Sequence, residues 1–428
     1  MKHYVPLRGF IASCLLGLVT NPASLSSRAW ADDWTRFRGQ NGSGIAESNV
    51  TIPWKSENVK KVKLVGSGHG SPVVWNERAF LMSADSNTGT RFLIAYDLNS
   101  GSLVWQRDFR SRTYSMHKFS SYASTTPCVD EERVYTAFAD PDQTILVATT
   151  HDGAEIWRRD FGRYVSQHGF GTSPICVGEL VILLNSQDAM ELPPGVEPGQ
   201  DRMVALNRRT GETVWETELP TSRVCYGVPC IWDNPEGKEL VCSTTAQGMF
   251  GLDLATGKLL WNHQCFKERI CSSSLLIGDL LIGTQGSGGG KGNTLVAFDL
   301  NTKKERFRVT KSCPYVPSPV ASDQHLFLWG DAGIVTCVDP KGGSTIWTQR
   351  VAGDFSGSPV IVNDNLINVS ATGVVHILKA SGEFERVGEI ELGESVRSTI
   401  VPMTSKLLIR SETSLFIVSE NLQRVSQP

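Results

Sequence analysis

One eleven-residue pattern recurs along this chain and limits the folds that are open to it. Its clearest copy spans residues 95–105, where an apolar run ends at Asp97, a tight turn closes at Gly101, and a second run carries Trp105. An aspartate at a strand end accepts hydrogen bonds from backbone amides just after it, and glycine supplies the positive φ that a short loop needs. Tryptophan buries a large apolar face. The pattern therefore predicts a β-hairpin whose second strand packs against a neighbouring element.

Later copies repeat this hairpin at a regular interval. Tryptophan, or a residue in its place, occurs at positions 105, 157, 215, 261, 307, 347 and 387, with spacings of 52, 58, 46, 46, 40 and 40 residues. A period of this length, with strand patterns and no helical pattern, indicates the blades of a β-propeller. The residues assigned to the structural repeat are Asp97, Gly101, Trp105, Gly153, Trp157, Gly211, Trp215, Asp253, Gly257, Trp261, Asp299, Asp339, Gly343 and Trp347.

A second mark, a small residue followed by proline, opens an apolar run earlier in each unit. Proline is tolerated at the first residue of a strand, where the ladder needs no donor. Because two marks recur in phase, chance does not account for them. The pairs are Ser71-Pro72, Thr126-Pro127, Ser173-Pro174, Val228-Pro229, Ser318-Pro319 and Ser358-Pro359, with Ser273-Ser274 in the fifth place.

The number of strands at the two ends of the chain decides the architecture. Seven units run from residue 70 to about residue 390, and three further strands follow up to residue 418. That last unit lacks an outer strand, whereas residues 59–64 read as a strand that lacks a blade. Joining the two removes both exposed sheet edges. We therefore predict an all-β fold: an eight-bladed β-propeller of four-stranded antiparallel blades, closed by the N-terminal strand, with residues 59–428 as a single domain.

The first 31 residues have the features of a secretory signal peptide. Lys2 and Arg8 precede the apolar run Phe10–Val19, and Ala29-Trp30-Ala31 is a small-x-small cleavage site. A lipidation site at Cys14 is disfavoured, because the apolar run continues beyond it. We predict cleavage near Ala31, a leader segment at residues 32–58, and a periplasmic or secreted protein without a membrane span.

The charge of the chain bears on the kind of partner that it could bind. The formal net charge is −3 and no block of Lys or Arg occurs, so we expect no nucleic-acid partner.

The chain has ten cysteines. Because Cys14 falls in the signal peptide, an odd number is left in the mature chain. We interpret Cys128, Cys176 and Cys230, which follow the opening prolines, as small buried apolar residues. Those near blade junctions are candidates for a disulfide whose pairing the sequence does not assign: Cys225, Cys265, Cys271 and Cys313.

The repeat A-x-D-x-x-T-G-x-x-x-W resembles the tryptophan-docking repeat of the pyrroloquinoline-quinone (PQQ) propeller superfamily. That superfamily includes quinoprotein alcohol dehydrogenases and the BamB-like scaffolds of outer-membrane protein assembly. Residues 34–44, WTRFRGQNGSG, also resemble the leader of secreted PQQ-like repeat proteins of planctomycete-type bacteria. The resemblance covers roughly residues 34–418 and implies the fold, whereas one fold serves both enzymes and binding proteins.

Loops that enter the first strand of each blade surround the central channel and are the candidate binding surface. Arginine and tyrosine around a concave rim suit an anionic or amphipathic ligand. The alternative is that these loops are simply polar, since eight blades always bring some such residues together. The candidate ligand-binding residues are His69, His117, Tyr122, His168, Tyr226, Arg269, Tyr315 and Arg397.

The resemblance leaves two main functions open. Quinoprotein alcohol dehydrogenases hold PQQ between a tryptophan and a disulfide of adjacent cysteines, with calcium bound by Glu, Asn and Asp, but this chain has no adjacent cysteines. We therefore predict a non-catalytic scaffold of the cell envelope that binds a protein, peptide or small ligand at the rim, with no catalytic residue, metal site or cofactor. The alternatives are an oxidoreductase that uses PQQ with calcium, or another cofactor, and a carbohydrate- or polymer-binding module.

Overall fold

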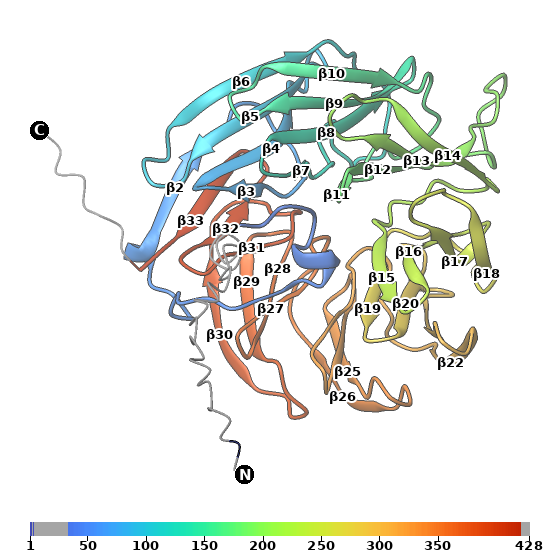
Figure 1. Cartoon of the computed structure of the whole chain (residues 1–428). Coiled ribbons are helices and arrows are strands. Elements are labelled where there is room, and N and C mark those ends of the chain that lie inside the picture. Colours follow the sequence, from blue (N-terminus) through green and yellow to red (C-terminus); the bar gives the residue numbers. More distant parts are fainter. Residues whose placement is uncertain (2, 4–32, 421–428) are drawn as a thin grey trace, which may run out of the picture.

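Eight β-sheets surround a central axis in the computed structural model, which describes residues 1, 3 and 33–420 (Figure 1). Each sheet contains one blade of four antiparallel strands, and one sheet has a fifth, parallel strand. The predicted eight-bladed propeller is confirmed. The signal peptide predicted for residues 1–31 lies almost wholly outside the described residues. Among the described residues, the helices are the short 3-10 turns η1 (Gln40–Gly42) and η2 (Ser56–Asn58), and neither could cross a membrane.

The first four blades follow one another along the chain. Blade 1 contains β3 (Val73–Trp75), β4 (Arg78–Ala84), β5 (Arg91–Asp97) and β6 (Leu103–Phe109). Blade 2 contains β7 (Cys128–Val129), β8 (Arg133–Asp140), β9 (Gln143–Thr150) and β10 (Glu155–Asp160). Blade 3 contains β11 (Ile175–Val177), β12 (Leu180–Asn185), β13 (Asp201–Asn207) and β14 (Thr213–Leu219). Blade 4 contains β15 (Cys230–Asn234), β16 (Gly237–Thr244), β17 (Gly248–Asp253) and β18 (Leu259–His263).

The remaining blades complete the ring. Blade 5 contains β19 (Leu275–Ile277), β20 (Leu280–Gln285), β21 (Thr294–Asp299) and β22 (Lys304–Val309). Blade 6 contains β23 (Val320–Ala321), β24 (Leu326–Trp329), β25 (Ile334–Val338) and β26 (Thr345–Arg350). Blade 7 contains β27 (Val360–Val362), β28 (Asn365–Val369), β29 (Val374–Lys379) and β30 (Arg386–Glu391), and β1 (Ile45–Ala46) adds a parallel strand to β27. Blade 8 contains β31 (Val401–Pro402), β32 (Leu407–Arg410), β33 (Ser414–Val418) and β2 (Val59–Lys63).

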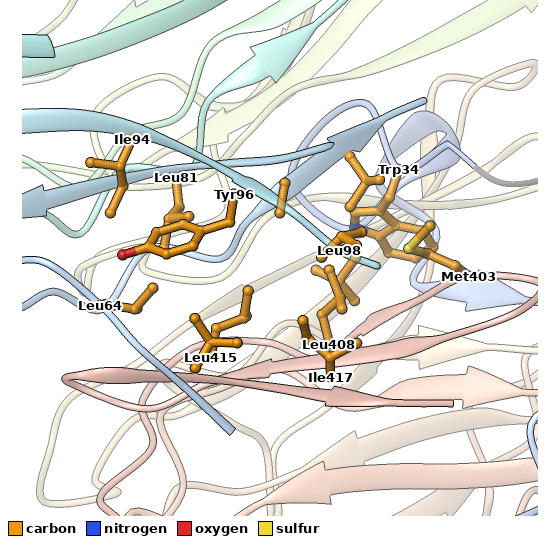
Figure 2. Close-up of a cluster of buried hydrophobic side chains, with 14 residues drawn as sticks. Trp34, Leu64, Leu81, Ile94, Tyr96, Leu98, Met403, Leu408, Leu415 and Ile417 are labelled. Carbon is orange, nitrogen blue, oxygen red and sulfur yellow. The ribbon is translucent and has the colours of Figure 1, made fainter. Parts of the chain in front are cut away.

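The N-terminal strand closes the ring, as predicted. Strand β2 pairs antiparallel with β33, so that Val59 lies opposite Val418 and Lys63 opposite Ser414. The seam between blades 8 and 1 buries an apolar cluster contributed by both ends of the chain (Figure 2). Labelled members are Trp34, Leu64, Leu81, Ile94, Tyr96, Leu98, Met403, Leu408, Leu415 and Ile417.

Three docking tryptophans, Trp105, Trp157 and Trp215, pack against the turn glycine of the next blade. Trp157 on β10 donates its indole N–H to the carbonyl oxygen of Arg208 at 2.9 Å, and a Cβ placed on Gly211 would lie 2.6 Å from the Trp157 ring. A side chain at position 211 would therefore collide with Trp157 as that ring now lies. Blade 5 differs, because Lys303 stands in place of the glycine and its Nζ lies 4.8 Å from the Trp261 ring centroid.

The small-residue-proline mark has a second physical cause, which the sequence interpretation did not find. Seven of the eight blade junctions carry a hydrogen bond, of 2.9–3.0 Å, from the backbone N–H at the mark to the hydroxyl at the mark of the next blade. In blade 8, Thr399 takes the corresponding place although no proline follows it. The acceptor side chains form a ring around the channel that is interrupted at Val228. They are Thr126, Ser173, Ser273, Ser318, Ser358, Thr399 and Ser71.

Completing this ring is expected to stabilise the protein. Val228→Thr conserves the volume of the side chain and places a hydroxyl where the Ser173 amide lacks the acceptor that the other junctions have. We expect the free energy of unfolding to rise by about 1 kcal/mol, the usual net value of a hydrogen bond. The reverse change, Thr126→Val, removes the acceptor of the Ser71 amide. It should lower the free energy of unfolding by about 1–2 kcal/mol. Urea denaturation measures both, and a destabilised Val228→Thr would show that the hydroxyl finds no donor.

The cysteines of the described residues are all free thiols. None of the four disulfide candidates is joined to another cysteine; the Cys225 sulfur lies 3.4 Å from Thr245 Oγ1, and the Cys313 thiol donates to the Val309 carbonyl oxygen at 3.2 Å. Cys128 and Cys230 are fully buried on first strands, as small apolar residues would be, whereas Cys176 is only partly buried.

Candidate functional site

A cavity of about 820 Å³ lies on the propeller axis and is lined by all eight blades. Its wall includes residues at the small-residue-proline marks and in the loops just before them, such as residues 168–171 and 397–399. Loops later in the blades, such as residues 286–288 and 331–332, complete it. Seven of the eight candidate residues line it: His69, His117, His168, Tyr226, Arg269, Tyr315 and Arg397. We call this cavity the cup.

The leader closes the cup at the end opposite these loops. First strands run away from the loops, and the leader crosses the channel at their far ends, with Phe37 forming part of the cup floor. Figure 1 shows this N-terminal segment, in blue, near the centre of the ring. Its contacts run from blade to blade: Trp34 N to Val74 O at 3.1 Å, Val129 N to Thr35 O at 2.9 Å, Arg36 Nη2 to Pro229 O at 2.6 Å, and Ile361 N to Gly44 O at 2.9 Å.

Arg38 anchors the leader between blades 6 and 7. Its guanidinium is 1% exposed and donates to the carbonyl oxygens of Pro319 at 2.7 Å and Pro359 at 3.0 Å. The same group donates to the leader's own Gly42 carbonyl at 3.2 Å, which folds the leader back on itself. Burial lowers the pKa of Arg38 to about 10, so the side chain is charged at neutral pH. One buried cation thus holds carbonyl groups that are some 280 or more residues away in sequence.

Three arginines face the cup, and their neighbours differ. Arg223 is paired with Glu191 at 2.8 Å and Glu268 at 3.6 Å, and Arg269 lies 3.7 Å from Asp188. Arg397 has no carboxylate within ion-pair distance among the residues that the structure describes. It donates to the Ser356 hydroxyl at 2.9 Å and lies 4.6 Å from the ring centroid of Phe119. Among the described residues, Arg397 is therefore the one arginine of the cup that pairs with no carboxylate.

Two histidines of the cup are neutral. Burial, together with the nearby charges of Arg410 and Arg397, lowers the pKa of His69 to about 3. Burial and the charge of Arg269 lower the pKa of His168 to about 4. The His168 ring nitrogen Nε2 lies 2.8 Å from Arg269 Nη1, where a neutral imidazole accepts the hydrogen bond. Neither of these two histidines contributes positive charge at neutral pH.

The tyrosines divide into two groups. Tyr226 and Tyr315 line the cup, and the Tyr226 hydroxyl donates to the Gly169 carbonyl oxygen at 3.3 Å. The Tyr315 amide donates to Asp331 at 2.7 Å, which holds its loop in place. Tyr122, also a candidate, lies outside the cup lining: its hydroxyl donates to the Tyr114 carbonyl oxygen at 2.8 Å and braces the loop from within.

Sequence reasoning missed other residues of the cup. Phe119 is 52% exposed, and the cations of Lys118 and Arg397 are 4.9 Å and 4.6 Å from its ring centroid. An exposed phenylalanine in an otherwise polar loop was an available signal. Phe37 at the floor had no such signal, because its position depends on the path of the whole leader.

The cup does not fit the quinoprotein arrangement. Of its lining residues, Cys271 is the one cysteine, Phe37 rather than tryptophan forms the floor, and the carboxylates are Asp331 and Asp354. Among the described residues, no three His, Cys, Asp or Glu side chains gather as metal ligands would. The cup therefore offers neither an adjacent-cysteine disulfide for the PQQ face nor a ready calcium cage.

Comparison with known proteins agrees with the fold. The family model described as outer membrane protein assembly factor BamB matches residues 27–309 and 292–383. Similar solved structures include BamB from Moraxella catarrhalis, at 14% identity and a TM-score of 0.61 over 84% of this chain and 98% of that one.

Enzymes appear among the similar structures as well. A europium-containing methanol dehydrogenase matches at 11% identity and a TM-score of 0.63 over 90% of each chain. Quinohemoprotein alcohol dehydrogenase from Comamonas testosteroni matches at 10% identity and a TM-score of 0.67 over 94% of this chain and 83% of that one. At such identities the likeness shows the fold alone. No curated protein matches the sequence.

Proposed function

Because the chain belongs to the family of the outer membrane protein assembly factor BamB, we propose that it is a non-catalytic scaffold of the cell envelope. It binds a segment of a partner protein in the cup. The segment is acidic and carries an aromatic or aliphatic side chain. This proposal follows the site rather than the fold, since the same fold also serves dehydrogenases.

The position of Arg397 carries the proposal. Its guanidinium faces the cup beside the exposed ring of Phe119, and among the described residues no carboxylate neutralises it. A carboxylate that reaches Arg397 gains a charge-assisted hydrogen bond, and an apolar side chain beside it covers Phe119. A ligand with an acidic residue next to a hydrophobic one can make both contacts, the first with Arg397 and the second with Phe119.

The closed floor limits how a ligand enters. A volume of about 820 Å³ is within the usual range of small-ligand pockets and has room for only a few side chains. Because the leader blocks the far end, a peptide cannot thread through the channel. The bound segment is therefore a loop tip or a chain end of the partner.

Binding of short labelled peptides tests the proposal. We expect an Asp/Phe peptide to bind and a Lys/Phe peptide of equal length to bind much more weakly, as measured by fluorescence anisotropy. Arg397→Met should weaken binding of the acidic peptide about tenfold, because a charge-assisted hydrogen bond of about 1.5 kcal/mol or more is lost. Arg306→Met, on the exposed outer strand β22, is the control and should leave binding unchanged.

The pH dependence adds an independent check. His117 also lines the cup, so the check uses the variant His117→Gln. Since the pKa values of His69 and His168 lie near 3 and 4, neither gains a proton between about pH 7.5 and about pH 5.5, and the affinity of this variant for the acidic peptide should stay constant. Equal binding of both peptides would contradict the proposal. Tight binding of PQQ with calcium, accompanied by dye-linked dehydrogenase activity, would favour an oxidoreductase instead.

A further inference from the structure

Two cysteine sulfurs from neighbouring blades lie against each other beneath the leader. Cys128 Sγ on β7 and Cys176 Sγ on β11 are 2.9 Å apart, although 48 positions separate the residues in sequence. A disulfide has an S–S distance of about 2.05 Å, so a shift of about 0.9 Å would bring the atoms to bonding distance. The two strands belong to different sheets, and a bond here would join blade 2 to blade 3.

The surroundings give one of the two thiols access to solution. Cys128 is fully buried, whereas Cys176 is partly exposed and lines a second cavity of about 280 Å³ on the leader side of the ring. Arg36 lines the same cavity. Its side chain is 6% exposed, and its Nε has no hydrogen-bond partner among the described residues. Burial, together with the neighbouring Cys128, raises the pKa of the Cys176 thiol, so the thiolate forms most readily while the two cysteines are exposed to solvent, as they are during folding.

We propose that Cys128 and Cys176 form a reversible disulfide that staples blade 2 to blade 3. The bond forms when the chain meets a low-molecular-weight disulfide, as it would in the oxidising compartment of the proposed function. Its formation in the test tube does not depend on what the cup binds. The other described cysteines lie outside the staple, since their sulfurs contact hydroxyls or backbone groups rather than another cysteine where a partner is resolved.

The chemistry is a pair of thiol–disulfide exchanges. The Cys176 thiolate attacks one sulfur of glutathione disulfide, the S–S bond of glutathione breaks, and one glutathione leaves with the proton that Cys176 gave up. The Cys128 thiolate then attacks the Cys176 sulfur of the mixed disulfide and releases the second glutathione, which takes the second proton. Two protein thiols are oxidised to one disulfide, and one glutathione disulfide is reduced to two thiols.

The staple should stabilise the ring. Cross-linking residues that are 48 positions apart restricts the unfolded chain. For a propeller of this length we expect the melting temperature of the oxidised protein to exceed that of the reduced protein by about 5 °C. Cys176→Ala should remove this difference between the two redox states, while the matched control Cys265→Ala, a partly buried cysteine elsewhere, should retain it.

The test maps the bond directly. The full chain is incubated in a glutathione redox buffer, its free thiols are alkylated in denaturant, and its peptides are analysed by mass spectrometry without reduction. We expect a cross-linked peptide that contains Cys128 and Cys176, and none from Cys176→Ala. A parallel sample refolded from denaturant in the same buffer removes any barrier of access to Cys128. If both samples retain these two thiols, or if either cysteine pairs with a different partner, the proposal is overturned.

Discussion

Replacing Arg38 with methionine is expected to lower the free energy of unfolding by about 4 kcal/mol. The buried guanidinium donates to the carbonyl oxygens of Pro319, Pro359 and Gly42, and each buried acceptor left without a donor costs about 1–3 kcal/mol. Methionine retains much of the volume but none of the donors. Thermal denaturation should show a fall in melting temperature of about 5 °C for a domain of this size.

Hydrogen exchange locates the effect of this change. We expect the amides of the leader, such as that of Gly44, to exchange faster in Arg38→Met, while those of the central strands of the blades remain protected. The control is Arg110→Met, at an exposed loop position, which should change stability by less than about 0.5 kcal/mol. Unchanged stability and leader protection in Arg38→Met would mean that Arg38 does not anchor the leader.

Gly211→Ala is expected to cost about 3 kcal/mol of stability. Gly211 has φ +73°, a conformation that costs an L-residue about 1–2 kcal/mol, and the added methyl group would lie 2.6 Å from the Trp157 ring. Overpacking of this kind adds about 1–3 kcal/mol. The tryptophan must then move away from the turn, which weakens its hydrogen bond to the Arg208 carbonyl oxygen. Chemical denaturation with urea measures the loss.

A matched glycine separates the two contributions. Gly162 has φ +81° and nothing within 4 Å of an added methyl group, so Gly162→Ala should cost only the conformational part, about 1–2 kcal/mol. In a background of Trp157→Leu, the cost of Gly211→Ala should shrink toward the Gly162 value, because the clashing ring is gone. An equal cost for both glycine substitutions in the wild-type background would refute packing between blades as the reason for glycine at this position.

Sequence reasoning identified the blades because their marks are local and repeated. Trp157 and Gly211 recur at blade spacing, and each makes sense from turn and packing chemistry that acts within one blade or between neighbours. The pairing of β2 with β33 was also predictable. One end of the chain has an unpaired strand and the other an incomplete blade, and pairing them removes both exposed sheet edges. The positions of the hydroxyl ring were recognisable in the sequence as a small residue before proline. That their hydroxyls accept hydrogen bonds from the neighbouring blade was not.

The cup was predicted only in part. Its candidate residues came from the loops before the marks, and these loops do surround the channel, but Tyr122 lies behind the lining and Phe119 was passed over. A side chain's direction in an irregular loop depends on the packing of that loop, which no periodic pattern encodes. The pairing of Arg223 and Arg269 with carboxylates, and its absence at Arg397 among the described residues, depends likewise on loops from several blades.

The sequence by itself determined the repeat, the number of blades and the way the ring closes, since each depends on contacts of one blade with the next. Tertiary structure alone decided that the leader forms a floor and that Arg38 binds carbonyl groups of blades 6 and 7, far along the chain. The physical reason is the circular arrangement. Closing the ring brings together residues whose separation along the chain bears no relation to their distance in space.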